Sequence, residues 1–207
     1  MNFYHLILLD ASGSMNCIRQ TALTGCNETL QSIRAMQHNH TNQQHFVSLV
    51  SFNSEDPARI ILDCRPAGGT TDLPADAYLP NACTPLYDAV GIAIARMEKA
   101  LPATDCCVLV TIITDGLENA SIEYNAASLK RLVEQKKKQN WTFAFIGANQ
   151  DEVMEAGRIG IRNTLRFDQN ERGTRKMFSR LGTAMERFCK EAPVMTREER
   201  ETGFFRS

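Results

Sequence analysis

The chain has 207 residues, of which 43% are hydrophobic and 23% charged, and its formal net charge is −1. This length and composition suit one soluble domain with a well-buried core. The near-neutral charge gives no bulk electrostatic reason to expect nucleic acid or an anionic membrane as a partner, so neither is predicted.

The first predicted element is an apolar strand that ends in a cluster of oxygen-bearing side chains. The run Leu6–Leu9 has no polar interruption, which is typical of a strand buried on both faces of a parallel sheet. Asp10 follows directly, and Ser12 and Ser14 come at alternate positions in a short turn. Carboxylate and hydroxyl oxygens are hard ligands that suit Mg²⁺, Mn²⁺ or Ca²⁺. The sequence therefore predicts half of a divalent-cation site here.

The next segments predict a helix and then a hairpin at one edge of a sheet. Residues 17–38 have apolar side chains at helical spacing, and residues 45–52 and 58–63 are predicted strands. The two strands are close enough in sequence to pair as a hairpin, which puts one antiparallel edge on an otherwise parallel sheet. Residues 65–83, rich in Gly and Pro, predict a long loop that rims the cation site.

The second half of the cation site is predicted from the following helix and strand. Thr84 is placed to cap this helix, with Pro85 at its first position. The apolar strand 108–113 then leads to Asp115. Because open α/β sheets bind ligands beyond the carboxyl ends of their strands, we expect the side chains of Thr84 and Asp115 to face the same crevice as Asp10.

Together these segments resemble the von Willebrand factor A (vWA) domain family and its metal-ion-dependent adhesion site (MIDAS). The resemblance rests on DASGSM at residues 10–15, on CTPLYDAV around Thr84 and on ITDG around Asp115. The five positions that match the family's metal ligands are Asp10, Ser12, Ser14, Thr84 and Asp115. Asp10 and Ser12 alone would fit a helix cap and turn equally well. Cys83 stands where the family often has glycine, a departure that concerns the loop rather than ligation.

The resemblance implies a stand-alone intracellular vWA member with a complete MIDAS. Its ion, Mg²⁺ or alternatively Mn²⁺ or Ca²⁺, would keep a position for an Asp or Glu carboxylate of a protein partner. The resemblance also implies that Thr84 and Asp115 exchange direct and water-mediated contact with the ion, and that the last helix moves with this switch. We therefore expect a cytoplasmic, non-enzymatic adaptor. Such members work beside ATPases, or beside kinase or phosphatase modules like those of tellurite-resistance operons.

The remaining segments complete a doubly wound, Rossmann-like α/β fold. Helices are predicted over residues 125–139, 149–158 and 172–190, and strands over residues 141–146 and 164–167. We expect a six-stranded, mostly parallel sheet with one antiparallel edge strand and helices on both faces. This vWA domain would span residues 1–190, and residues 191–207 would form a charged C-terminal tail.

Several other features have plain structural explanations. Seven cysteines without zinc-like pairs fit reduced, buried thiols in a cytosolic protein. The N-terminal apolar run lacks the basic flank and the length of an export signal. His38, His40 and His45 are expected at the surface rather than in a zinc site. The basic stretches 136–138 and 172–180 predict solvated helix faces, with a partner-docking surface as the alternative.

Two other functions would use the same fold. A metal-dependent phosphatase or hydrolase would employ Asp10 as nucleophile or ligand and would need a further acid, for which Glu118 and Asp88 are the nearby candidates. The sequence contains no phosphate-binding glycine loop and no nucleophile elbow. The other alternative is a metal-independent scaffold.

Overall fold

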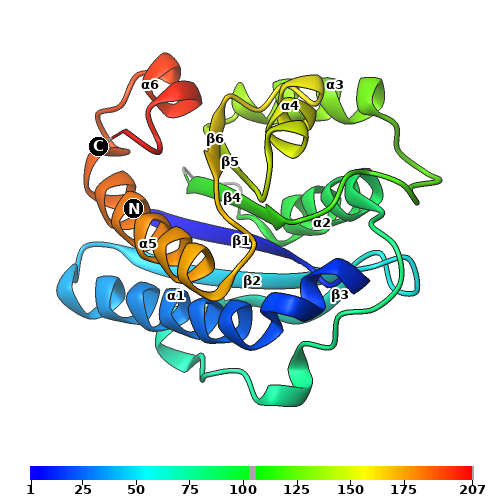
Figure 1. Cartoon of the computed structure of the whole chain (residues 1–207). Coiled ribbons are helices and arrows are strands. Elements are labelled where there is room, and N and C mark those ends of the chain that lie inside the picture. Colours follow the sequence, from blue (N-terminus) through cyan, green and yellow to red (C-terminus); the bar gives the residue numbers. More distant parts are fainter. Residues whose placement is uncertain (103–105, 207) are drawn as a thin grey trace.

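A six-stranded sheet organises the protein in a computed structural model that describes residues 1–102 and 106–206 (Figure 1). The strands are β1 (Asn2–Asp10), β2 (Gln44–Phe52), β3 (Arg59–Pro66), β4 (Cys106–Thr114), β5 (Trp141–Gly147) and β6 (Asn163–Arg166). They lie in the order β3-β2-β1-β4-β5-β6. β3 pairs antiparallel with β2, and every other neighbouring pair is parallel. The predicted fold class is confirmed, including the antiparallel edge.

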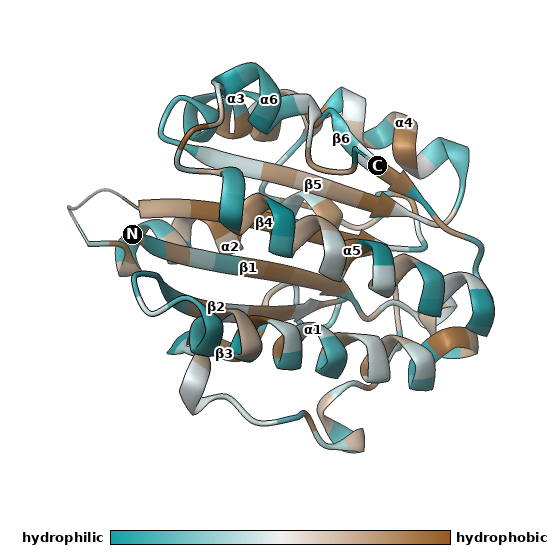
Figure 2. Ribbon diagram, turned by 90° about the vertical axis from the view of Figure 1, so that its left-hand side faces the viewer, coloured by the Kyte–Doolittle hydropathy of each residue, from teal (hydrophilic) through white to brown (hydrophobic). Residues whose placement is uncertain are grey.

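Helices cover both faces of this sheet. They are α1 (Arg19–Asn39), α2 (Leu86–Ala100), α3 (Ala126–Lys137), α4 (Gln150–Arg158), α5 (Glu171–Glu191) and the short α6 (Arg197–Thr202). One core forms between the sheet and the pair α1 and α5, and a second between the sheet and α2, α3 and α4. Figure 2 shows the hydrophobic residues gathered along the strands, while much of the outer surface of the helices is hydrophilic.

The uninterrupted apolar run of β1 follows from these two cores. Successive side chains of a strand point to opposite faces of the sheet. Phe3, Ile7 and Leu9 therefore join the core under α1 and α5, whereas Leu6 and Leu8 join the core under α2. Since both faces are covered, apolar side chains are favoured at each position from Leu6 to Leu9.

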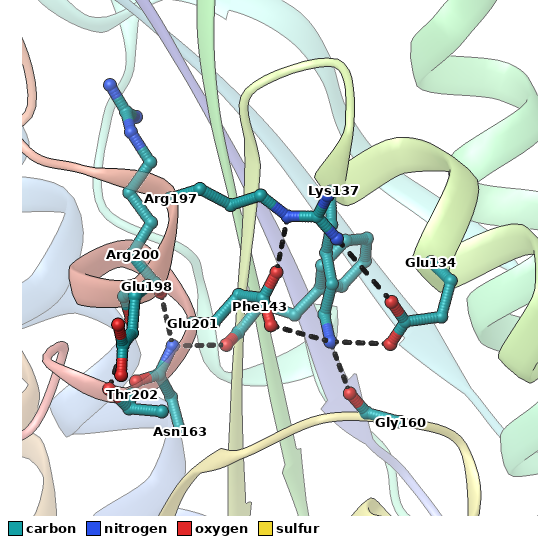
Figure 3. Close-up of polar contacts among 10 residues, drawn as sticks. All are labelled: Glu134, Lys137, Phe143, Gly160, Asn163, Arg197, Glu198, Arg200, Glu201 and Thr202. Atoms are coloured by element: carbon teal, nitrogen blue, oxygen red, sulfur yellow. Dashed lines mark hydrogen bonds and ion pairs between the residues drawn. The ribbon is translucent and has the colours of Figure 1, made fainter.

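The segment after α5 folds back onto the domain. Residues 191–207, predicted as a charged tail, contain α6 and the buried Phe204, whose ring packs edge-on against Phe188. Figure 3 shows how α6 is tied to its neighbours: Asn163 of β6 donates to the Arg200 carbonyl over 2.7 Å. Residue 207 lies outside the described part, and the division of the chain at residue 190 stays a prediction.

The three lysines at the end of α3 do not form one solvated face, so that prediction is wrong for two of them. Lys136 is 1% exposed and Lys137 is 6% exposed, while Lys138 is exposed. Lys136 Nζ pairs with Glu98 and lies 5.7 Å from the centroid of the Trp141 ring. Long basic side chains can bury their stems when the charged end finds partners.

The prediction that the cysteines are buried holds for only part of the set. Cys26, Cys107 and Cys189 are buried, but Cys17 and Cys83 are exposed. The basic residues of α5 lie at the surface as expected, at positions 172, 175, 176 and 180. Among the described residues, no helix combines the length and the apolar character needed to cross a membrane.

Replacing Lys137 with alanine should destabilise the fold. Lys137 Nζ donates to the Gly160 carbonyl and pairs with Glu134 over 2.8 Å and, more weakly, with Glu201 of α6 over 3.9 Å (Figure 3). Losing these charge-assisted contacts should lower the free energy of unfolding by about 2 kcal/mol. Urea unfolding measures it, and Lys138→Ala, at the exposed neighbour, should stay within about 0.5 kcal/mol of wild type. Equal losses for both variants would contradict the described burial.

Candidate metal centre

The site begins at Asp10, the last residue of β1, whose side chain is fully buried. The backbone N–H of Ser12 donates to Asp10 Oδ1 over 2.7 Å. Thr114 Oγ1, at the end of β4, donates to Asp10 Oδ2. Because β1 and β4 are parallel neighbours, their carboxyl ends meet at one edge of the sheet, and both oxygens of Asp10 are held there.

The loop after β1 brings Ser12 and Ser14 against the loop after β4. A short 3₁₀ helix, η1 (Gly13–Ile18), turns the chain immediately after Ser12. Ser12 Oγ and Ser14 Oγ lie 3.2 Å apart, and Ser14 Oγ donates to Asp115 Oδ1 over 2.7 Å. Ser12 is buried while Ser14 is exposed, so the cluster opens to solvent on the side of Ser14.

Thr84, in the loop before α2, lies close to the Asp10 carboxylate, and the space around Gly116 shows this. A β carbon built on Gly116 would lie 2.8 Å from Thr84 Oγ1 and 3.7 Å from Asp10 Oδ2. Any side chain at this position would push against the Thr84 hydroxyl, which explains the glycine. The five predicted site residues therefore converge at the ends of β1 and β4, from three separate segments.

Thr84 does not cap α2, so that prediction is wrong. The helix begins at Leu86, Pro85 occupies the position before it, and no side chain caps this end. The backbone N–H of Thr84 instead donates to Asn119 Oδ1 over 2.8 Å, which fixes the loop against the segment after β4. This arrangement leaves the Thr84 hydroxyl available to the cluster.

Burial dominates the electrostatics of the two carboxyl groups. It raises the pKa of Asp10 to about 7, although hydrogen bonds from Thr114 and Ser12 act to lower it. Burial also raises the pKa of Asp115. Carboxylates removed from water need a compensating cation or hydrogen-bond donors. Two carboxylates and three hydroxyls form an all-oxygen donor set, which fits a hard divalent cation.

Two residues of this cluster were not predicted from the sequence. Thr114 holds Asp10, and it stands directly before the Asp-Gly pair at the end of an apolar strand, a position that could have suggested it. Gln169, in the loop between β6 and α5, donates from Nε2 to Asp115 Oδ2 and to the Ser14 carbonyl. Nothing in the local pattern around Gln169 points to this contact, because it joins segments far apart in sequence.

The two acids named for an enzymatic role are engaged elsewhere. Glu118 accepts hydrogen bonds from the N–H groups of Tyr87, Ala120 and Ser121. Asp88 accepts from the N–H groups of residues 122, 123 and 124. Both carboxylates organise the segment after β4, which in turn places Gly116 and Asp115.

Comparison with known proteins identifies the fold. No family model and no curated protein matches the sequence. The PilB minor pilin of Streptococcus sanguinis superposes with a TM-score of 0.63 at 16% identity, over 90% of this chain and 61% of PilB. Proximal thread matrix protein 1 of the mussel byssus, whose MIDAS motif holds zinc, gives 0.59 at 14% identity, over 89% of this chain and 46% of its own.

A third solved structure is the manganese-loaded TRAP protein of Plasmodium vivax. It gives a TM-score of 0.53 at 16% identity, over 86% of this chain and 73% of TRAP. The chain thus spans less than two thirds of PilB and of the mussel protein. At these identities the likeness establishes a vWA-like, Rossmann-type fold. TRAP holds manganese and the mussel protein holds zinc.

Without metal, the stability of the protein should fall as the pH rises from about 4 to about 7. Burial raises the pKa of Asp10 to about 7 in the folded state, so over this range the folded chain binds a proton that the unfolded chain has released. The expected loss is on the order of 2 to 4 kcal/mol. Asp10→Asn should remove this part of the pH dependence in urea unfolding with EDTA.

The matched control is Asp76→Asn, at an exposed carboxyl group. It should keep the wild-type pH profile. If Asp10→Asn and wild type lose stability equally between the two pH values, the burial of Asp10 does not govern the titration.

Proposed function

We propose that this chain is a metal-dependent protein-interaction module. In this proposal Asp10, Ser12, Ser14, Thr84 and Asp115 hold a Mg²⁺ ion, which binds a carboxylate from an Asp or Glu of a partner protein. The observation that carries it is the hydrogen bond between Ser14 and Asp115, formed beside the Asp10 carboxylate by segments 101 residues apart in sequence.

Charge and coordination number support a ligand from outside. Two carboxylates neutralise a divalent cation, and three hydroxyls add no formal charge. Mg²⁺ prefers six oxygen ligands, so five side chains leave at least one position for an oxygen from outside the chain. A partner carboxylate, which is a hard anionic oxygen ligand, is suited to such a position.

The finer parts of the proposal concern setting and partners. We place the module in the cytoplasm as an adaptor, beside an ATPase, a kinase or a phosphatase system. The non-enzymatic role is supported by the engagement of Glu118 and Asp88 with backbone N–H groups, which occupies the acids that a hydrolytic mechanism would need. Mg²⁺ is preferred over Mn²⁺ and Ca²⁺ in this proposal because it is the abundant small divalent ion of cells.

Mg²⁺ should stabilise the wild-type protein against thermal unfolding and should not stabilise the Asp10→Ala, Asp115→Ala double variant. An ion that binds only the folded state adds about 2.7 kcal/mol at a hundredfold excess over its dissociation constant. Melting curves at rising Mg²⁺ measure this gain, with Asp76→Ala as an exposed-carboxylate control that should respond like wild type.

Partner binding is then tested by affinity capture from lysate in Mg²⁺ and in EDTA, with wild type and the double variant as baits. The proposal expects a partner protein that the wild-type bait retains only in Mg²⁺. Substitution of one acidic residue of that partner should abolish its retention. Suppose that Mg²⁺ stabilises the protein but the same partners are captured with or without Mg²⁺ and by either bait. That result would refute the interaction role and leave the metal site standing.

A further inference from the structure

A second cluster of metal-ligating side chains lies in the core under α5, away from the oxygen site. One nitrogen of His5, one nitrogen of His45 and the sulfur of Cys189 all lie within 4.8 Å of one another. These residues come from β1, β2 and α5, and all three are buried. The prediction that His45 is a surface residue is therefore wrong.

The alternation of the strands explains why these histidines face inward. His5 lies between Phe3 and Ile7 on the β1 face that α1 and α5 cover. His45 stands two residues before Val47, which belongs to the same core. Two imidazoles on adjacent parallel strands thus meet beneath one helix, at positions where the pattern calls for apolar residues.

Hydrogen bonds orient the two rings. His5 Nε2 and His45 Nδ1 are 3.0 Å apart, and His45 Nε2 lies 3.2 Å from Gln43 Oε1. The amide of Gln43 also donates to the Cys189 carbonyl over 3.1 Å. When His45 Nε2–H donates to Gln43 Oε1, the lone pair of His45 Nδ1 points toward His5. A metal-binding histidine usually donates its other ring N–H to a neighbouring acceptor in this way.

One polar atom of this cluster has no partner in the described structure. His5 Nδ1 is buried and makes no hydrogen bond there. Burial also lowers the pKa of His5 to about 3 and that of His45 to about 4. Both rings are therefore neutral at physiological pH, which is the form that binds a metal. An ion bound by His5 Nε2 and His45 Nδ1 would replace the hydrogen bond that joins these two nitrogens, and the proton of the His5 ring would then lie on Nδ1.

We propose that His5, His45 and Cys189 form a buried binding site for a borderline-soft transition metal, with Zn²⁺ as the expected ion. Imidazole nitrogen and thiolate sulfur are the ligands that zinc favours. A tetrahedral zinc ion holds such donors roughly 3.3 to 3.6 Å apart, so no pair of these donor atoms has to close by more than about 1.5 Å.

Zinc binding requires the Cys189 thiol to release its proton to solvent. Burial holds the pKa of this thiol far above its usual range, and the nearby Cys107 raises it further. A divalent ion reverses this preference because it supplies the charge that the thiolate lacks. Arg200 of α6 also brings positive charge to the region, with Nη1 3.1 Å from Cys107 Sγ. The ion enters as the chain folds, since the site is buried.

This site differs from the oxygen site in chemistry and in place. His5 precedes Asp10 by five residues on β1, which corresponds to about 16 Å along the strand. Mg²⁺ has little affinity for sulfur and imidazole, whereas zinc accepts both. The zinc site therefore does not depend on the proposed Mg²⁺ site.

Cobalt(II), a spectroscopic substitute for zinc, tests the assignment. The full chain carrying Cys17→Ser and Cys83→Ser, which removes the two exposed thiols, is refolded from urea with Co²⁺. We expect a sulfur-to-cobalt charge-transfer band that saturates at one equivalent per chain and is absent when equimolar Zn²⁺ is present during refolding. Cys189→Ser and His5→Gln should lose the band. Cys26→Ser, at a buried thiol of α1 in the same core, should keep it.

The Asp10→Ala, Asp115→Ala double variant should keep the band, which separates this site from metal bound at the oxygen cluster. Absence of the band in the folded Cys17→Ser, Cys83→Ser protein would overturn the proposal. This outcome does not require the Cys189→Ser variant to fold. Survival of the band in a folded Cys189→Ser variant would overturn it as well.

Discussion

The reversal of strand order between β1 and β4 is the constraint on which the rest of the structure depends. The chain leaves β1 toward β2 on one side and leaves β4 toward β5 on the other. The two loops therefore diverge at the carboxyl edge of the sheet and open a crevice between them. Asp10 and Asp115 occupy these loops, and Thr84 enters from the loop before α2, so topology alone brings together side chains far apart in sequence.

The burial of Asp10 links this topology to cation binding. An apolar strand delivers the carboxyl group into the core, where desolvation raises its pKa and disfavours its charged form. The donors around it, Thr114 and the N–H of Ser12, offset only part of this cost. Under the proposed function, a divalent ion would offset this cost, and its affinity would come from the same burial that fixes the position of the carboxylate.

The sequence predicts strands and loops that depend on a local residue pattern. It does not predict the burial of polar side chains, which depends on the elements that pack against them. Apolar runs ending at Asp10 and before Asp115 define two strand ends, which predicts that the oxygen-bearing side chains of the two following loops meet at one edge of the sheet. The burial of Lys137 depends on Gly160 and Glu201, and no pattern on α3 reveals it. The burial of His45 could have been predicted, because its two-residue spacing from Val47 and Leu49 places it on the covered face of the sheet.

Helix α5 runs from the oxygen cluster to the cluster of His5, His45 and Cys189. It begins at Glu171, two residues after Gln169, whose amide contacts Asp115 at the oxygen site. It carries Cys189 near its other end, and its 21 residues are about 30 Å long. One end of the helix is therefore tied to the oxygen cluster through Gln169 and Asp115, and the other end places Cys189 beside the two core histidines.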